Sequence, residues 1–135
     1  MREFNWNVRV YYEDTDAAGV VYHGNYLKFM ERARTEWLRA IGLSQDVLHK
    51  EQGIIFAVTK MNIRFQLPAH IDELLAVNTK LVKTGGASLL FLQSITNQQE
   101  RLLCDADVNA ACLNASTLKP QRLPGSLISA LANVN

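Results

Sequence analysis

The segment from Tyr26 to Ile41 has the clearest hydrophobic periodicity in the chain. Its apolar residues recur at helical spacing, which predicts an amphipathic helix of about 16 residues and ~24 Å. The apolar face carries Met30, Ala33, Trp37 and Ile41, with Leu27 and Leu38 beside them, and the polar face carries Lys28, Glu31, Arg32, Glu36 and Arg39. Asn25 is expected to cap the start of this helix, and Gly42 is expected to end it.

Most of the remaining chain has the alternation that is typical of strands. Val8–Tyr12 is β-branched and aromatic, which predicts a first strand. After Gly53, the apolar residues Met61, Ile63 and Phe65 alternate with polar ones, so one face of a second strand is expected to lie in the core. Three further strands are expected at Leu75–Leu81, Ala87–Thr96 and Leu102–Leu113.

Short separators between the last three strands favour hairpin turns. These separators are Gly85-Gly86 and Asn97–Glu100, and strands joined by such turns are antiparallel. Two short helices are expected, at Ser44–Glu51 and Ser126–Leu131. The long amphipathic helix needs a broad apolar surface, so residues 1–135 are expected to form a single α+β domain. In this domain a curved antiparallel sheet of about five strands wraps around the helix.

Charge and composition narrow the possible partners and location. Fourteen Lys and Arg against thirteen Asp and Glu give a net charge of +1, so no strong field attracts nucleic acid. No apolar run approaches the ~18 residues of a membrane-spanning helix. Cys104 and Cys112 lie in one predicted strand, ~26 Å apart at about 3.3 Å per residue, which is too far for a disulfide. A reduced, cytoplasmic setting is expected.

The loop between the first strand and the long helix concentrates the candidate chemistry. Glu13, Asp14 and Asp16 precede a flexible Ala17–Gly19 turn, and His23 follows it. The first amides of a helix lack internal partners, so they can stabilise an oxyanion that forms on a substrate carbonyl. Asp16 would then act as a nucleophile, or as the base that deprotonates a water. A thioester suits such a site best, because its thiolate leaves without help from a serine triad or a metal.

Two other interpretations of the acidic loop stay open. Its carboxylates can simply be solvated or cap a turn, and Asp14 and Asp16 form an Asp-x-Asp pair that can hold Mg²⁺ or Ca²⁺. The chain lacks calcium-loop, His-x-x-x-His and Cys-x-x-Cys spacings, so no metal and no cofactor are predicted. His49 and His70 are expected at surface or turn positions. There is no Gly-x-Ser-x-Gly elbow, which argues against a serine hydrolase of the α/β type.

The run Asp14–His23, followed by Asn25-Tyr26-Leu27, resembles the hotdog-fold acyl-CoA thioesterases of the 4-hydroxybenzoyl-CoA thioesterase type. Within that family it is most similar to the bacterial branch associated with the Tol-Pal cell-envelope system. Later segments fit the same branch, so the resemblance covers nearly the whole chain: Gly86-Ala87-Ser88, Phe91, Gln93, Lys119-Pro120 and Leu123-Pro124. The resemblance implies the hotdog fold, with protomers paired side by side as a homodimer or as a homotetramer built from two dimers.

The resemblance also implies roles for individual residues. The catalytic carboxylate falls on Asp16 and the oxyanion donor on the backbone amide of His23, whose imidazole is implicated as well. Substrate-binding residues are expected at Tyr12, Val21, Tyr22, Gly24 and Ser88. Ala17 and His23 stand where the benzoyl-CoA enzymes carry proline and tyrosine. Short aliphatic acyl-CoA, or acyl groups on acyl carrier protein, are therefore the expected substrates rather than aromatic acyl groups.

The sequence thus favours a cytoplasmic acyl-CoA thioesterase, with peripheral association at the inner membrane as an option. A hotdog dehydratase or hydratase is the second class, since those enzymes also use a histidine and a carboxylate on an acyl thioester. A non-enzymatic protein of the envelope or lipid-synthesis machinery is the third. Asp16 precedes His23 by seven residues in one loop, and this arrangement favours the thioesterase.

Overall fold

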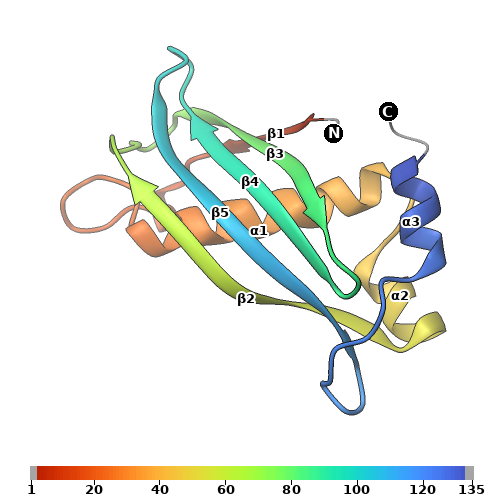
Figure 1. Cartoon of the computed structure of the whole chain (residues 1–135). Helices are drawn as coiled ribbons and strands as arrows, with labels where there is room; N and C mark the ends of the chain where they lie inside the picture. The colour runs from red at the N-terminus through yellow and green to blue at the C-terminus, as the bar shows by residue number, and fades with distance from the viewer. Residues whose placement is uncertain (1–2, 133–135) are drawn as a thin grey trace.

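A computed structural model describes residues 3–132 of the chain. One antiparallel sheet wraps around one long helix, and two short helices lie at one end of the sheet (Figure 1). The elements in chain order are β1 (Glu3–Arg9), the 3-10 helix η1 (Tyr12–Asp14), α1 (His23–Ala40), α2 (Gln45–Gln52), β2 (Ile54–Phe65), β3 (Leu74–Thr84), β4 (Ser88–Thr96), β5 (Leu102–Asn114) and α3 (Gly125–Ala132).

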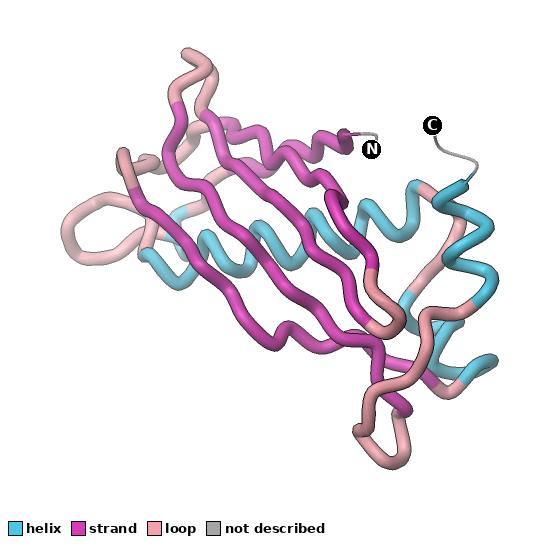
Figure 2. Tube along the Cα trace, viewed as in Figure 1, coloured by secondary structure: helices cyan, strands magenta, loops and turns pink. Residues whose placement is uncertain are grey.

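The sheet has five strands in the order β1-β3-β4-β5-β2, and every neighbouring pair is antiparallel. Hairpins join β3 to β4 and β4 to β5, as Gly85-Gly86 and Asn97–Glu100 predicted. Figure 2 shows the strands crossing the long helix obliquely, with the segment between β1 and α1 at the end opposite α2 and α3. Strand β2 therefore forms one edge of the described sheet and β1 forms the other.

Helix α1 presents its apolar stripe to the sheet, as the periodicity predicted. Its buried residues are Tyr26, Phe29, Met30, Ala33, Trp37 and Leu38. The ring of Trp37 packs edge-on against Phe91 of β4, with the ring centroids 5.1 Å apart. The expected end of the helix is confirmed, because Gly42 follows it with φ +89°, a conformation that favours glycine.

The predicted start of this helix is wrong by one turn. Helix α1 begins at His23, and Asn25 lies inside its first turn instead of capping it. The amide of Asn25 donates to the Tyr22 carbonyl at 2.8 Å, and its side chain donates to Asp14. Asn25 therefore ties the helix to the preceding loop, a role that its capping propensity does not reveal.

The first strand was also misplaced. Strand β1 spans Glu3–Arg9, whereas the sequence predicted Val8–Tyr12. Phe4, Trp6 and Val8 occupy alternate positions and face the core. The segment that carries them is the strand that pairs with β3. Tyr12 belongs to the 3-10 helix instead, so the chain has already left the sheet before the carboxylates begin.

A buried polar link crosses the interface between helix and sheet. Gln93 of β4 is 2% exposed, and its amide nitrogen donates to the Met30 carbonyl at 3.0 Å and to the Thr79 hydroxyl at 2.9 Å. Its amide oxygen accepts from the Arg34 guanidinium at 2.9 Å. Because buried polar groups are costly to leave unpaired, this link fixes how α1 sits over β3 and β4.

Cys104 and Cys112 both lie in β5 as free, buried thiols, which confirms that they share one strand and form no bridge. Burial raises the pKa of the Cys104 thiol to about 12, with a smaller contribution from Asp105. This thiol is therefore a packing group and not a nucleophile. Within residues 3–132, no helix has the length and apolar character needed to cross a membrane.

Candidate active site

The acidic loop is a short hairpin that leads directly into α1. Thr15 and Val21 form a β-bridge, and between them the Asp16 amide donates to the Val20 carbonyl at 2.9 Å. Gly19 closes the turn by donating to the Asp16 carbonyl at 3.0 Å, and its φ of +82° explains the need for glycine. The hairpin leaves the side chain of Asp16 exposed, just before the chain returns to the start of the helix.

The carboxylate of Asp16 is available for chemistry. One oxygen, Oδ1, accepts from the Ala18 amide at 2.9 Å, which is a local turn contact. Among the described residues, the other oxygen has no hydrogen-bond partner and no cation within salt-bridge distance. The local turn therefore orients the carboxylate while leaving one oxygen free to take a proton or to attack a carbonyl.

Asp14, in contrast, is a structural carboxylate. It is 8% exposed, and its two oxygens accept from the Tyr11 amide at 2.8 Å and from the Asn25 side chain at 2.9 Å. Because N–H donors occupy both oxygens, Asp14 is poorly placed to share a metal ion with Asp16. No group of three His, Cys, Asp or Glu side chains in residues 3–132 has the arrangement of a metal site.

Replacing Asp14 by Ala is expected to lower the free energy of unfolding by about 2–3 kcal/mol, because two donors to a buried carboxylate lose their acceptor. Urea unfolding followed by circular dichroism measures this change. Glu13→Ala is the matched control, since Glu13 is the exposed neighbour and is expected to change stability by less than about 0.5 kcal/mol. Equal stability of the two variants would show that Asp14 does not hold the loop.

The first turn of α1 presents backbone donors beside this loop. No acceptor from the described residues reaches the amides of His23 and Gly24, and the Tyr22 side chain makes no capping hydrogen bond. The positive end of the helix dipole lies at the same place. A Cβ on Gly24 would come within 2.8 Å of the Tyr22 ring, so only glycine fits here without a shift of that ring. Free amides of this kind can stabilise an oxyanion.

Aromatic rings surround the side chain of His23. Its imidazole lies 4.4 Å from the Tyr22 ring and 6.1 Å from the Phe65 ring, measured between centroids. Phe65 ends strand β2 and is half exposed, and it also packs 5.8 Å from Tyr26. The alternation of Met61, Ile63 and Phe65 predicts only a core-facing position for Phe65. Its position shows that the free end of edge strand β2 forms one wall of the site.

A second loop anchors the site from the other side. The Val21 amide donates to the Ala69 carbonyl at 2.9 Å, and the Ala69 amide donates to the Tyr26 hydroxyl at 3.0 Å. Burial raises the pKa of Tyr26, so its hydroxyl stays protonated. The hairpin is thus fixed both to α1 and to the segment that precedes β3.

The predicted substrate-binding residues divide into three groups. Tyr12, Tyr22 and Gly24 lie on the loop or the first helical turn, and Tyr12 is 82% exposed. Val21 is 4% exposed and packs in the core, so its side chain cannot line an open site. Ser88 begins β4 opposite Ala111 of β5, whereas Phe65 lies opposite Cys104, which places Ser88 at the far end of the sheet (Figure 1). Within one chain, Ser88 and the loop are not brought together.

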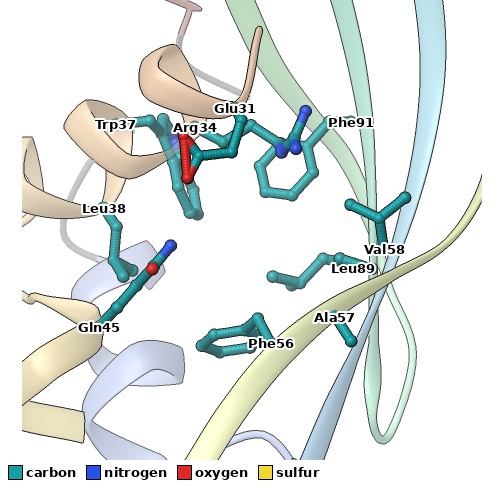
Figure 3. Close-up of a pocket in the computed structure, with 11 residues that line it drawn as sticks. Glu31, Arg34, Trp37, Leu38, Gln45, Phe56, Ala57, Val58, Leu89 and Phe91 are labelled. Carbon is teal, nitrogen blue, oxygen red and sulfur yellow. The ribbon is translucent and has the colours of Figure 1, made fainter. Parts of the chain in front are cut away.

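A cavity of about 150 Å³ opens between α1, α2 and the sheet (Figure 3). Its walls are mostly apolar, with a few polar groups among them: Glu31, Arg34, Trp37, Leu38, Gln45, Phe56, Ala57, Val58, Leu89, Phe91 and Ala110. The sequence pattern does not indicate this cavity. It places Glu31 on the polar face of the helix, and the cavity forms only where α1, α2 and the sheet come together.

A long helix wrapped by an antiparallel sheet is the hotdog fold. The site lies where the hairpin that carries Asp16 meets the free amides at the start of this helix. Known proteins support this assignment. The thioesterase superfamily matches residues 18–104. The acyl-CoA thioester hydrolase YbgC of Escherichia coli is 45% identical over 126 residues, which is 93% of each chain.

Solved structures agree with the sequence relatives. A probable thioesterase from Bartonella henselae is 40% identical, with a TM-score of 0.87 over 91% of this chain and 100% of that one. The DHNA-CoA thioesterase of Staphylococcus aureus is 28% identical, with a TM-score of 0.92 over 99% of this chain and 91% of that one. The chain therefore belongs to the thioesterase superfamily, in its YbgC branch, and is a thioester hydrolase. The predicted family, fold class and enzyme class are confirmed.

Proposed function

We propose that the chain hydrolyses acyl-CoA thioesters, with Asp16 as the catalytic carboxylate and the amides of His23 and Gly24 as the oxyanion site. The observation that carries this proposal is the pairing of an exposed carboxylate with two free backbone donors at one helix start. The YbgC relatives, whose names specify acyl-CoA thioesters, support CoA as the carrier.

The reaction follows from the geometry of the loop and the helix start. The thioester carbonyl oxygen points at the free amides, which stabilise the negative charge as the carbonyl becomes tetrahedral. Asp16 either removes a proton from the attacking water or attacks the carbonyl carbon itself, giving an anhydride that water then hydrolyses. The carbon–sulfur bond breaks, and CoA leaves as a thiolate. The imidazole of His23 orients the carbonyl or protonates this thiolate.

The active unit is a dimer joined along β2. In the described residues this strand is an unpaired edge, and it carries exposed apolar side chains at Val58 and Phe65. Long unprotected edges invite pairing with another strand. In the proposed dimer, β2 (Ile54–Phe65) of one copy pairs antiparallel along its whole length with β2 of the second copy. Phe65 of each copy then lies beside Ile54 of the other. The loop of each copy then lies next to the other copy's cavity.

A short acyl group fits this arrangement only if the site is shared. From His23 to Arg34, helix α1 rises about 16 Å, which a short acyl chain cannot span within one copy. Across the paired edges, the loop beside Phe65 instead faces the cavity wall formed by Phe56, Ala57 and Val58. The cavity therefore receives the acyl chain of the thioester held by the partner's loop.

A thiol-release assay on purified protein tests the proposed function. The substrates are straight-chain acyl-CoA thioesters of graded length, with the same acyl groups on acyl carrier protein, and enoyl-CoA to detect hydration. We expect release of CoA that is fastest for short acyl groups, because the cavity volume of about 150 Å³ limits chain length. Hydration of enoyl-CoA without thiol release would instead support a dehydratase or hydratase, and no turnover of any substrate would overturn the proposal.

A further inference from the structure

The cavity in Figure 3 contains a cation, Arg34, that has no ion-pair partner among residues 3–132. Arg34 comes from α1, and its guanidinium donates at 2.9 Å to the amide oxygen of Gln93. No carboxylate of the described residues lies within 4 Å of it. Burial lowers the pKa of Arg34, and Glu31 partly offsets this effect. Buried cations are usually paired, so a half-buried arginine on the wall of this cavity is suited to bind an anion that a ligand brings.

The position of this arginine is fixed. Gln93 is almost fully buried and is held in turn by the Met30 carbonyl and the Thr79 hydroxyl. The guanidinium is thus oriented by the link between helix and sheet and is not free to follow solvent. Glu31 also lines the cavity, but in Figure 3 its carboxylate points toward Trp37, whereas the guanidinium lies toward Phe91. The charge of Glu31 acts on Arg34, but the two side chains form no ion pair.

We propose that Arg34 binds a carboxylate at the far end of the acyl group, so that the enzyme prefers short acyl thioesters that carry a terminal carboxylate. This inference rests on the proposed function, because it takes the cavity as the acyl site. An arginine that is already oriented makes strong, directional hydrogen bonds to a carboxylate. The apolar walls at Trp37, Leu89 and Phe91 then contact the intervening methylene groups.

The cavity is small, at about 150 Å³, so it suits an acyl group with only a few heavy atoms beyond the thioester carbonyl. A succinyl group has two methylenes and a carboxylate beyond that carbonyl, which matches this size. The 4-methylpentanoyl group is its uncharged counterpart of the same shape. The two thioesters therefore differ mainly in the charge that Arg34 would meet.

The test compares kcat/KM for succinyl-CoA and 4-methylpentanoyl-CoA, with the uncatalysed breakdown of each subtracted. The unaltered protein is expected to favour succinyl-CoA by about tenfold or more, as expected for a buried charge-assisted contact. Arg34→Met keeps the apolar stem and removes the charge, so it is expected to abolish this preference. Glu31→Gln removes a repulsive carboxylate and is expected to increase the preference.

Two controls separate selectivity from folding and from catalysis. Arg32→Met removes a charge from an exposed arginine on the same helix that does not line the cavity, and the preference should persist. Circular dichroism and turnover of 4-methylpentanoyl-CoA report whether Arg34→Met is folded and active. Hydrolysis of the uncharged thioester with no preference for succinyl-CoA would overturn this inference and leave the proposed function standing. Absence of thiol release from both substrates would overturn this inference alone if other short acyl-CoA thioesters are hydrolysed, and the proposed function as well if none is.

Discussion

Replacing Asp16 by Asn is expected to lower the rate of thiol release by about a thousandfold, the usual effect of losing a catalytic acid–base group. The amide of Asn neither accepts a proton from water nor attacks a carbonyl. The amides of His23 and Gly24 remain in place, so binding and part of the oxyanion stabilisation should survive. The loss is therefore expected in kcat, with little change in KM.

The same substitution should leave the fold intact. Asp16 is exposed, and its only side-chain hydrogen bond in the described chain comes from the Ala18 amide. The side-chain oxygen of Asn can accept the same hydrogen bond. Urea unfolding is expected to agree with that of the unaltered protein within about 0.5 kcal/mol. Glu13→Gln is the matched control, because it removes an exposed carboxylate from the same loop and should retain full turnover.

These experiments also separate the two roles open to Asp16. A nucleophilic Asp16 passes through an anhydride, and attack of ¹⁸O-labelled water at the aspartyl carbonyl of this anhydride places the label in the aspartate side chain in a single turnover. A general base leaves that side chain unlabelled, with the label only in the product acid. Turnover of Asp16→Asn at the level of the unaltered protein would sink both mechanisms and move the catalytic carboxylate elsewhere.

The sequence predicted the parts of the fold that depend on local periodicity. The stripe of Met30, Ala33 and Trp37 identified both the central helix and its buried face, and the glycine pair at Gly85-Gly86 identified a hairpin. Each of these signals comes from residues that are close together in the chain. The hairpin from Asp16 to Gly19 belongs to the same class, because a turn residue and an Asx contact create it locally.

The errors arose where distant residues determine the outcome. Asn is a residue type that often caps helices. Here the side chain of Asn25 instead donates to the buried carboxylate of Asp14, and the helix begins earlier, at His23. The hydrogen bond between Arg34 and Gln93 is another such case, because it joins α1 to β4 across 59 positions of the chain and no local pattern predicts it. Ser88 stays a prediction as a substrate-binding residue, because strand register places it at the opposite end of the sheet from the loop of its own chain and only a second chain could bring the two together.

The proposal that two chains share each site leads to the second expected result, which concerns mixtures of two inactive variants. Asp16→Asn removes the carboxylate, and Leu89→Trp, on β4 away from the edge strand, fills the cavity. Each variant alone should be inactive toward short acyl-CoA. In a randomly mixed population, half of the dimers contain one chain of each kind, and one of their two sites is intact. Activity should therefore recover to roughly a quarter of that of the unaltered protein, as two-fold symmetry requires.

The opposite mixture provides the matched control. A chain that carries both Asp16→Asn and Leu89→Trp, mixed with the unaltered protein, should inactivate every mixed dimer, because each site receives one defective half. If each site were complete within one chain, this mixture would keep the activity of its unaltered chains, and the two single variants would not recover. The two arrangements therefore predict opposite outcomes for the same pair of mixtures.

The measurement needs mixed dimers of known composition. The two chains are co-expressed with different affinity tags, and purification through both tags isolates the mixed dimers. Light scattering then checks that their mass is about twice the 15.2 kDa of one chain. Purified mixed dimers of the two single variants should show about half the activity of the unaltered dimer, since one site of two is intact. Inactive mixed dimers that retain the correct mass and circular dichroism spectrum would place the whole site within one chain and remove β2 pairing from the mechanism.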